Sequence, residues 1–146
     1  MRGVRLAFEV TETAFLEGDA VTAQHLQRLR NEGVQIWLDD FGDGHSSIRY
    51  LVDFPLDGVK VSEYFVRRAM DEPKARAVLA SMRKLTKSLG LELVAEGVET
   101  REQWEMLRNM GYERVQGFYC SRALSAERVA DVWQEERSVS WDGLPS

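Results

Sequence analysis

Residues 34–42 read VQIWLDDFG, and this stretch decides the class of fold. Its first five residues are mainly apolar with no polar face, which predicts a buried strand. Asp39 and Asp40 follow at once, and aspartate is a poor strand residue, so we expect the strand to end there. Gly33 precedes the strand and ends a helix expected from about Asp19 to Glu32. The pattern is therefore a helix, a buried strand and a loop that opens with two acids.

The same alternation continues along the chain. Further strands are expected at Val4–Val10, Val59–Val61, Leu91–Ala95 and near Glu113–Phe118. Helices are expected at Glu63–Met70, from Pro73 to Gly90, from Thr100 to Met110, from Ser125 to about Glu136, and in a short piece from Ser46 or Ser47 through Leu51. A proline that opens a helix, a glycine that ends it and a Thr100–Gln103 capping box support these assignments.

Strands that alternate with helices imply right-handed crossovers and a parallel sheet. We count five β/α units in 146 residues, whereas a complete (β/α)₈ barrel needs about 250 residues. The predicted fold class is therefore α/β, a partial TIM-type barrel. Such a sheet would leave two open edges with unpaired backbone groups, so we expect a homodimer or a missing N-terminal half to cover them.

Composition excludes several classes of protein. An apolar content of 44% excludes a disordered chain, and the apolar runs are too short to span a membrane. The formal charge of −5 argues against a DNA or RNA polymer held by bulk charge. Cys120 is the single cysteine and cannot form an intrachain disulfide, so the reducing cytoplasm is the expected compartment.

Polar residues interrupt the predicted strands at or near their carboxyl ends. They are Glu9, Asp39, Asp40, Lys60, Glu96 and Gln116. Active sites of parallel α/β folds form at that edge, because the loops converge there. Four carboxylates at one rim would repel one another unless cations neutralise them, and hard divalent ions such as Mg²⁺ or Mn²⁺ suit such ligands. Lys60 would then orient a water or a phosphate oxygen beside the metal ions.

Simpler interpretations exist for each of these residues. An acid at a strand end can be a solvated loop residue or the N-cap of the next helix. Lys60 can lie along apolar surface with its charged end in water. The glycine-containing loop at residues 41–47 can cradle a phosphate or act as a lid, or it can be a plain turn.

Five motifs then show a resemblance. FEVTET (8–13), DDFGDGHSS (39–47), VKVS (59–62), VAEGVET (94–100) and QGFYCSRAL (116–124) resemble the EAL-domain family, over a stretch from about Leu6 to Val132. The resemblance implies a modified TIM barrel that hydrolyses cyclic di-GMP to pGpG with two Mg²⁺ or Mn²⁺ ions. Cyclic di-GMP is thus the expected substrate, with no membrane segment and no nucleic-acid polymer involved.

The resemblance also assigns roles to particular residues. The metal-binding carboxylates of the family match Glu9, Asp39, Asp40 and Glu96. Lys60 matches the lysine that contacts the nucleophilic water, and Gln116 matches the glutamine near that water. Glu99 is the second acid of the AEGVE motif and is expected to be catalytic together with Lys60, Glu96 and Gln116. Glu12 matches the glutamate that stabilises the loop after DDFG, a loop that supports dimerisation and metal binding in the family.

Two departures from the family pattern bear on activity. The Glu-Ala-Leu motif lies in the N-terminal part of such domains, and this chain is expected to lack that part. A metal-binding glutamate, an arginine and an asparagine of the family would then be lacking as well. We therefore expect residues 1–137 to be the C-terminal part of an EAL domain, with a tail at 138–146, and the chain alone to be inactive or nearly so. Ser62 stands where the family has an aspartate, which would weaken activity even in a complete domain.

Two other functions stay open from the sequence. The first is a non-catalytic module that binds cyclic di-GMP or a protein, which Ser62 favours and the retained carboxylates and Lys60 oppose. The second is a different Mg²⁺-dependent barrel enzyme with no selectivity for cyclic di-GMP. Metal-dependent turnover separates an enzyme from a binding module.

Overall fold

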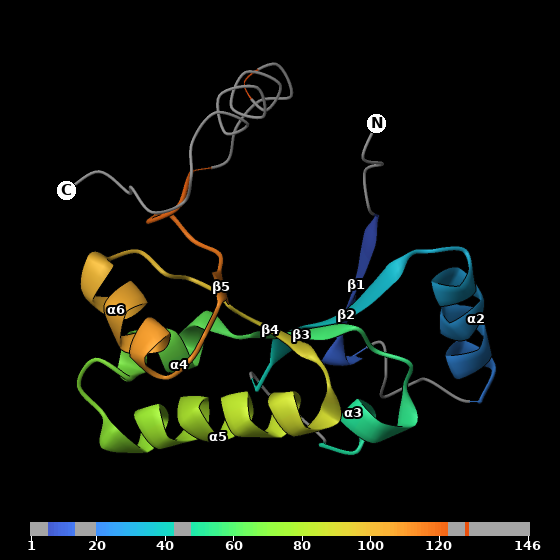
Figure 1. The fold of residues 1–146 in the computed structure, drawn as a ribbon, viewed down its shortest axis with the longest axis horizontal. Coiled ribbons are helices and arrows are strands. Elements are labelled where there is room, and N and C mark those ends of the chain that lie inside the picture. Colours follow the sequence, from blue (N-terminus) through green and yellow to red (C-terminus); the bar gives the residue numbers. More distant parts are fainter. Residues whose placement is uncertain (1–5, 14–19, 43–47, 123–127, 129–146) are drawn as a thin grey trace.

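The fold is a curved parallel sheet with helices along its outer side (Figure 1). The computed structural model describes residues 6–13, 20–42, 48–122 and 128. The five strands are β1 (Ala7–Thr11), β2 (Gln35–Phe41), β3 (Gly58–Val61), β4 (Glu92–Ala95) and β5 (Arg114–Val115). Each pairs in parallel with the next, in the order β1-β2-β3-β4-β5. The predicted α/β class with parallel strands is confirmed, and the arrangement is that of part of a barrel.

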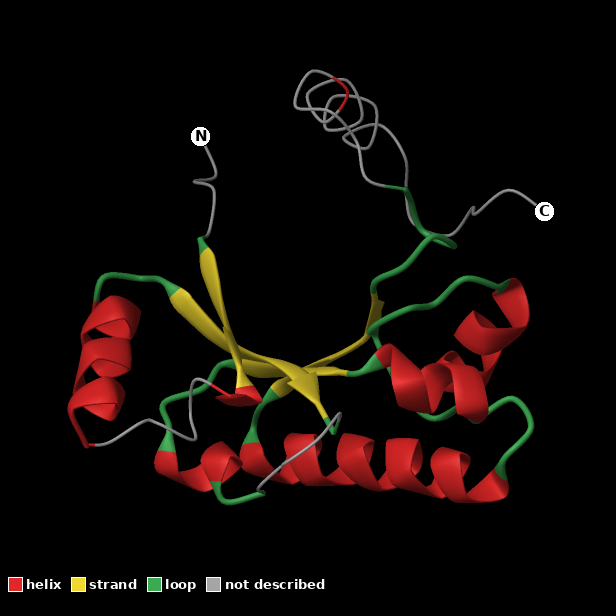
Figure 2. Cartoon of the chain, turned by 180° about the vertical axis from the view of Figure 1, so that it is seen from behind, coloured by secondary structure: helices red, strands yellow, loops and turns green. Residues whose placement is uncertain are grey.

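The helices connect successive strands and lie along the sheet. They are α2 (Ala20–Asn31), α3 (Tyr50–Asp53), α4 (Glu63–Arg68), α5 (Pro73–Leu89) and α6 (Arg101–Asn109). Seen from behind, α5 runs beneath the curved sheet and α2 lies at the β1–β2 end (Figure 2). No helix among the described residues is long and apolar enough to cross a membrane. The helix predicted from Ser125 lies outside the described residues, apart from Arg128.

Local sequence signals set most helix ends as predicted. Pro73 is the first residue of α5, where its missing N–H is not needed. Gly90 ends that helix with a left-handed φ of 71°. Thr100 and Gln103 form a complete capping box at α6. The short helix α3 differs, because Arg49 is its N-cap and makes no side-chain cap hydrogen bond.

The core lies between the sheet and the helices. Fully buried side chains of β2, β3, α5 and α6 contribute to it, among them Ile36, Leu38, Val59, Val61, Leu79 and Leu107. Every residue of β3 is buried, as expected for a central parallel strand covered on both faces. This packing fixes the backbone from which the polar residues at the strand ends project.

The prediction that the second strand ends before its two acids is wrong. β2 continues through Asp39 and Asp40 to Phe41. Its pairing with β3 shifts between Leu38 and Phe41, so that three steps along β2 match two along β3. Such a bulge accommodates one extra residue, and Asp40 has the left-handed φ of 53° that aspartate tolerates. The strand β2 is therefore distorted locally at its two acids and does not end before them.

Two other strand boundaries differ from expectation. β1 extends to Thr11 instead of ending at Val10. β5 contains only Arg114 and Val115, so Gln116 follows the strand instead of lying within it. The backbone N–H of Gln116 still donates to Ala95 O at 2.9 Å, which holds the glutamine beside the end of β4.

The capping box of α6 gives a prediction about stability. The Gln103 side chain accepts from both Glu99 N and Thr100 N, and the Thr100 side chain accepts from Gln103 N. Thr100→Ala removes one of these bonds and should lower the free energy of unfolding by about 1 kcal/mol, or about 3 °C in Tm. Thermal unfolding of this variant beside Thr100→Ser, which keeps the hydroxyl, is the measurement. Equal losses in the two variants would contradict the capping role.

Candidate functional site

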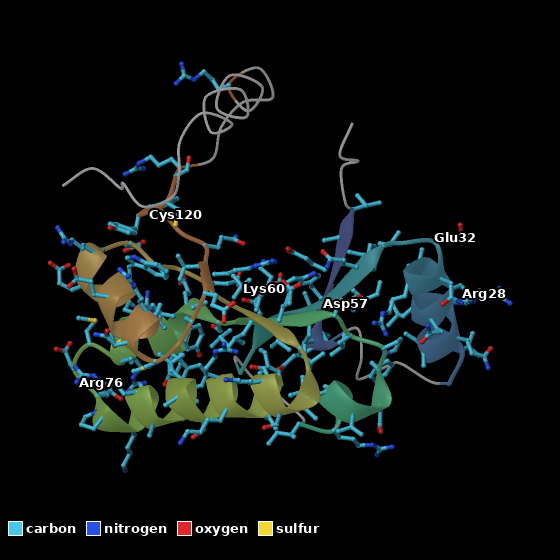
Figure 3. The ribbon with its side chains drawn as sticks, viewed as in Figure 1. Arg28, Glu32, Asp57, Lys60, Arg76 and Cys120 are labelled. Atoms are coloured by element: carbon cyan, nitrogen blue, oxygen red, sulfur yellow. The ribbon has the colours of Figure 1, made fainter. Side chains whose placement is uncertain are left out.

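A buried lysine surrounded by carboxylates lies at the carboxyl end of the sheet. Lys60 Nζ lies 3.0 Å from Glu9 Oε2, 3.0 Å from Asp39 Oδ1 and 2.8 Å from Glu96 Oε1. Its side chain is only 6% exposed, and it projects near the middle of the molecule in Figure 3. The interpretation in which its charged end lies in water is therefore wrong. Lys60 is the common partner of acids from three other segments.

The register of the sheet explains why these residues meet. Glu9 pairs with the residue two positions before Asp39, so the two acids lie on the same face. Lys60 likewise pairs with the residue two positions before Glu96. Neighbouring side chains in register, and those two apart along a strand, share one face of a sheet. The alternation of the strands thus directs all of these groups to the inner face of the curved sheet.

The charges in this cluster are strongly coupled. Burial lowers the pKa of Lys60, but its contacts with Glu96, Asp39 and Glu9 outweigh burial and raise the pKa above its ordinary value. The lysine is therefore charged at neutral pH. Burial raises the pKa of the Glu96 carboxyl; the nearby Lys60 opposes this shift, and the negative charges of Asp39 and Asp40 add to it. Lys60 therefore neutralises part of the negative charge of these acids.

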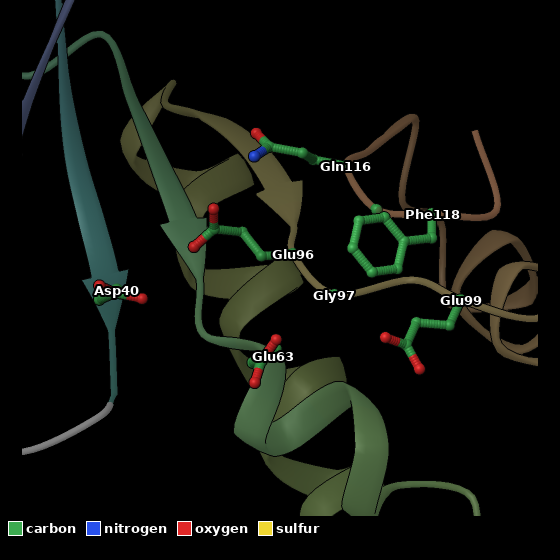
Figure 4. A pocket seen from close by; sticks show the side chains of 8 residues that line it. Asp40, Glu63, Glu96, Gly97, Glu99, Gln116 and Phe118 are labelled. Atoms are coloured by element: carbon green, nitrogen blue, oxygen red, sulfur yellow. The ribbon is translucent and has the colours of Figure 1, made fainter. Parts of the chain in front are cut away.

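An open pocket adjoins the cluster. Its volume is about 270 Å³, and its lining consists of Asp40, Glu63, Glu96, Gly97, Glu99, Gln116, Gly117 and Phe118. In Figure 4 Asp40 lies on one side, whereas Glu99 and Phe118 lie together on the other side. Glu96 connects the two features, since it lines the pocket and contacts Lys60. The pocket is thus acidic at one side and partly aromatic at the other.

The structure brings most of the predicted site residues into two adjoining groups. Glu9, Asp39, Lys60 and Glu96 form the buried cluster, while Asp40, Glu96, Glu99 and Gln116 line the pocket. Glu12 is 8% exposed, and its Oε1 accepts from Gly42 N at 3.2 Å. It therefore fixes the first residue of the loop after β2.

Apart from two glycines, two residues that line the pocket were not predicted from the sequence. Glu63 begins α4 two residues after β3, a strand-end position that resembles those of the predicted acids. Phe118 gave no signal, because an exposed aromatic residue cannot be distinguished from a core residue by sequence alone. Ser62 is 1% exposed and its hydroxyl accepts from Tyr64 N, so the residue that departs from the family pattern serves as the N-cap of α4.

The donor set suits a hard divalent cation in its chemistry. All the anionic groups are carboxylates, and the buried Asp39 Oδ1 lies 3.0 Å from Lys60 Nζ. Within the described part of the chain, however, no three such groups lie close enough together to form a ready-made metal site, because Lys60 lies between them.

Comparison with known proteins identifies the family. The EAL domain matches residues 2–123. The oxygen sensor protein DosP of Escherichia coli is 40% identical over 127 residues, which cover 87% of this chain and 16% of DosP. The cyclic di-GMP phosphodiesterase RocR of Pseudomonas aeruginosa is 36% identical over 124 residues, which cover 85% of this chain and 32% of RocR. The resemblance inferred from the motifs is confirmed.

Solved structures agree with the fold. The EAL domain of Mycobacterium smegmatis DcpA superposes with a TM-score of 0.83 at 32% identity, over 88% of this chain and 58% of that one. The PaMucR phosphodiesterase in complex with cyclic di-GMP gives 0.78 at 35% identity, over 85% and 50%. BlrP1 of Klebsiella pneumoniae, solved with manganese and cyclic di-GMP, gives 0.73 at 36%, over 79% and 30%. The chain thus spans less than two thirds of each of these proteins.

The lysine cluster predicts a large effect of one substitution. Lys60→Met leaves three carboxylates facing one another without their cation, which should lower the free energy of unfolding by about 3 kcal/mol. Denaturant unfolding measures this change. The matched control is Arg49→Met, which breaks an exposed ion pair with Asp53 and should change stability by less than about 1 kcal/mol. Similar losses for both variants would refute the structural role of Lys60.

Proposed function

The chain belongs to the EAL domain family, and we propose that residues 1–137 are the C-terminal part of a domain that hydrolyses cyclic di-GMP to pGpG. The observation that carries the proposal is the cluster of buried Lys60 and its three carboxylates. This cluster adjoins an acidic pocket. The names of RocR, a cyclic di-GMP phosphodiesterase, and of the PaMucR complex with cyclic di-GMP support the choice of substrate. The single Cys120 favours the reducing cytoplasm as the compartment.

In this proposal the carboxylates at the strand ends hold two divalent ions, Mg²⁺ or Mn²⁺. The ligands are Glu9, Asp39, Asp40 and Glu96, all of which present oxygen donors. When bound, the ions supply Lewis-acid chemistry toward the phosphodiester. The BlrP1 structures, solved with manganese or calcium together with cyclic di-GMP, support a divalent ion in this family.

The remaining residues position the reacting groups. Lys60 holds the Glu96 carboxylate in place at 2.8 Å and presents a permanent positive charge, which orients a water or a phosphate oxygen. Gln116 lines the pocket beside Glu96, and its amide can donate to and accept from the attacking water. Glu12 fixes Gly42 at the start of the loop that follows the two aspartates. Together these groups align water with one phosphodiester.

We propose further that the chain alone is inactive or nearly so. In the family, the N-terminal part of the domain contributes a metal-binding glutamate, an arginine and an asparagine, and this chain covers 58% of the DcpA domain. The site is then completed by that N-terminal half, and a homodimer is the alternative arrangement that covers the open edge of β1.

A second candidate function is a non-catalytic module that binds cyclic di-GMP. The observation that favours it is Ser62, whose hydroxyl is used to cap α4 at the position where the family has an aspartate. Such a module would bind the dinucleotide without releasing product.

Chromatographic detection of pGpG distinguishes the two candidates. The chain incubated with cyclic di-GMP and Mn²⁺ should yield no product above the blank. With an N-terminal segment that carries the Glu-Ala-Leu motif restored, pGpG should appear, and Glu96→Gln should lower its rate by roughly 100-fold or more. Binding without product from the restored domain would favour the non-catalytic module. Equal cleavage of cyclic di-AMP would indicate a different metal-dependent enzyme.

Thermal unfolding tests the proposed metal ligands without any turnover. Addition of Mn²⁺ should raise the Tm of the chain by about 3 °C, the shift that about 1 kcal/mol of ligand-linked stabilisation gives. Asp39→Asn should abolish the rise, because it removes the charge of a buried carboxylate among the proposed ligands. Asp53→Asn, at an exposed ion pair on α3, is the control and should keep the rise. An equal shift in both variants would exclude Asp39 as a ligand.

A further inference from the structure

Helix α5 carries a positive charge that the rest of the chain does not share. Its 17 residues include five basic side chains and no acid. The basic residues are Lys74, Arg76, Arg83, Lys84 and Lys87. Because the 19 basic and 24 acidic residues of the chain give a formal charge of −5, the residues outside this helix have a formal charge of −10. Apart from Lys60, every lysine of the chain lies on α5.

The lysines of α5 point away from the sheet. The buried residues of this helix are Ala75, Leu79 and Thr86. At 3.6 residues per turn, Lys74, Lys84 and Lys87 lie within about 80° of the direction opposite to that buried side. All three are exposed. In the described part of the chain no element lies beyond α5 on its outer side (Figures 1 and 2).

The arginines of this helix interact within the protein, whereas the lysines do not. Arg76 donates to the backbone oxygens of residues 69 and 70, and Arg83 pairs with Glu113 at 2.9 Å. Among the described residues, the side chains of the three lysines have no hydrogen bond or ion pair. Their charges are therefore available to an external partner.

We propose that the outer face of α5 is a docking surface for an anionic lipid membrane, to which the chain binds peripherally. A lysine ammonium group is a compact charge without a fixed geometry, which suits a layer of mobile lipid phosphates. A helix of 17 residues is about 25 Å long, so its two outermost lysines contact lipids about 20 Å apart. This surface is separate from the pocket and does not depend on the proposed hydrolysis.

Other polyanions fit this face less well. Small residues, Ala77 and Ser81, lie between the lysines on the outer side of the helix. Among the described residues, Leu89 at the end of α5 is its one exposed large apolar side chain. A protein partner would therefore find no aromatic or apolar anchor at the centre of the face, and a single-stranded nucleic acid would find no ring on which its bases stack.

The acids elsewhere in the chain do not cancel the attraction. The pocket acids lie at the carboxyl end of the sheet, whereas the lysines project from the outer side of a helix about 10 Å thick. The Debye length is about 10 Å at 0.1 M ionic strength, so a membrane beyond the outer face is largely screened from those acids. Binding through α5 would also leave the pocket uncovered.

Vesicle co-sedimentation tests the proposal on the chain itself, with no metal ion or nucleotide present. The chain should bind vesicles of phosphatidylglycerol and phosphatidylcholine and should not bind vesicles of phosphatidylcholine alone. Raising the salt from about 0.1 M to about 0.5 M should release it, because screening shortens the range of these charges. Lys84→Gln combined with Lys87→Gln should weaken binding about 25-fold, or roughly fivefold for each lysine near an anionic surface.

A control pair removes the same charge at other exposed positions. Arg28→Gln combined with Arg101→Gln changes α2 and α6, and should weaken binding less than about twofold. Equal losses for the two pairs, equal binding to neutral vesicles, or no binding to anionic vesicles at low salt would overturn the proposal. Binding of duplex DNA or polyglutamate through the same lysines, without vesicle binding, would assign the face to another polyanion and overturn the lipid assignment. None of these results requires pGpG formation, so they are distinguishable from a failure of the proposed hydrolysis.

Discussion

The positive charge of Lys60 is the constraint on which the site depends. Three acids from different parts of the chain converge on its ammonium group, and the lysine side chain is only 6% exposed. Without that charge the same carboxylates would repel one another and destabilise the packing of the neighbouring strands that carry them. With it, they remain at one edge, preorganised and partly desolvated. Lys60 thus stabilises the fold and also positions the proposed metal ligands. A substitution of Lys60 is therefore expected to change both.

The irregular pairing of β2 is the second element of the arrangement. In a regular strand, consecutive residues point to opposite faces of the sheet. The shift between Leu38 and Phe41, with the left-handed φ of Asp40, interrupts that alternation. Asp39 contacts Lys60 while Asp40 lines the adjoining pocket. A bulge therefore connects the buried cluster with the pocket through two successive residues.

Sequence reasoning predicted the strand–helix alternation, the start of α5 at Pro73 and the capping box at Thr100, because local chemistry determines them. It also located the strand-end acids. It missed the bulge in β2, since the extra residue is accommodated by pairing with a distant strand. It placed Lys60 beside the metal ions but did not predict its direct pairing with the acids, because that pairing depends on register. The placement of Phe118 in the pocket depends on the same long-range packing.

The central claim is that the acids around Lys60 form a site for divalent cations. The most direct measurement is an anomalous difference map, recorded from crystals of the chain soaked with Mn²⁺. The account predicts manganese peaks bounded by the carboxylates of Asp39, Asp40 and Glu96. Manganese bound only at surface acids such as Glu113, with the Lys60 cluster free of any peak, would contradict it.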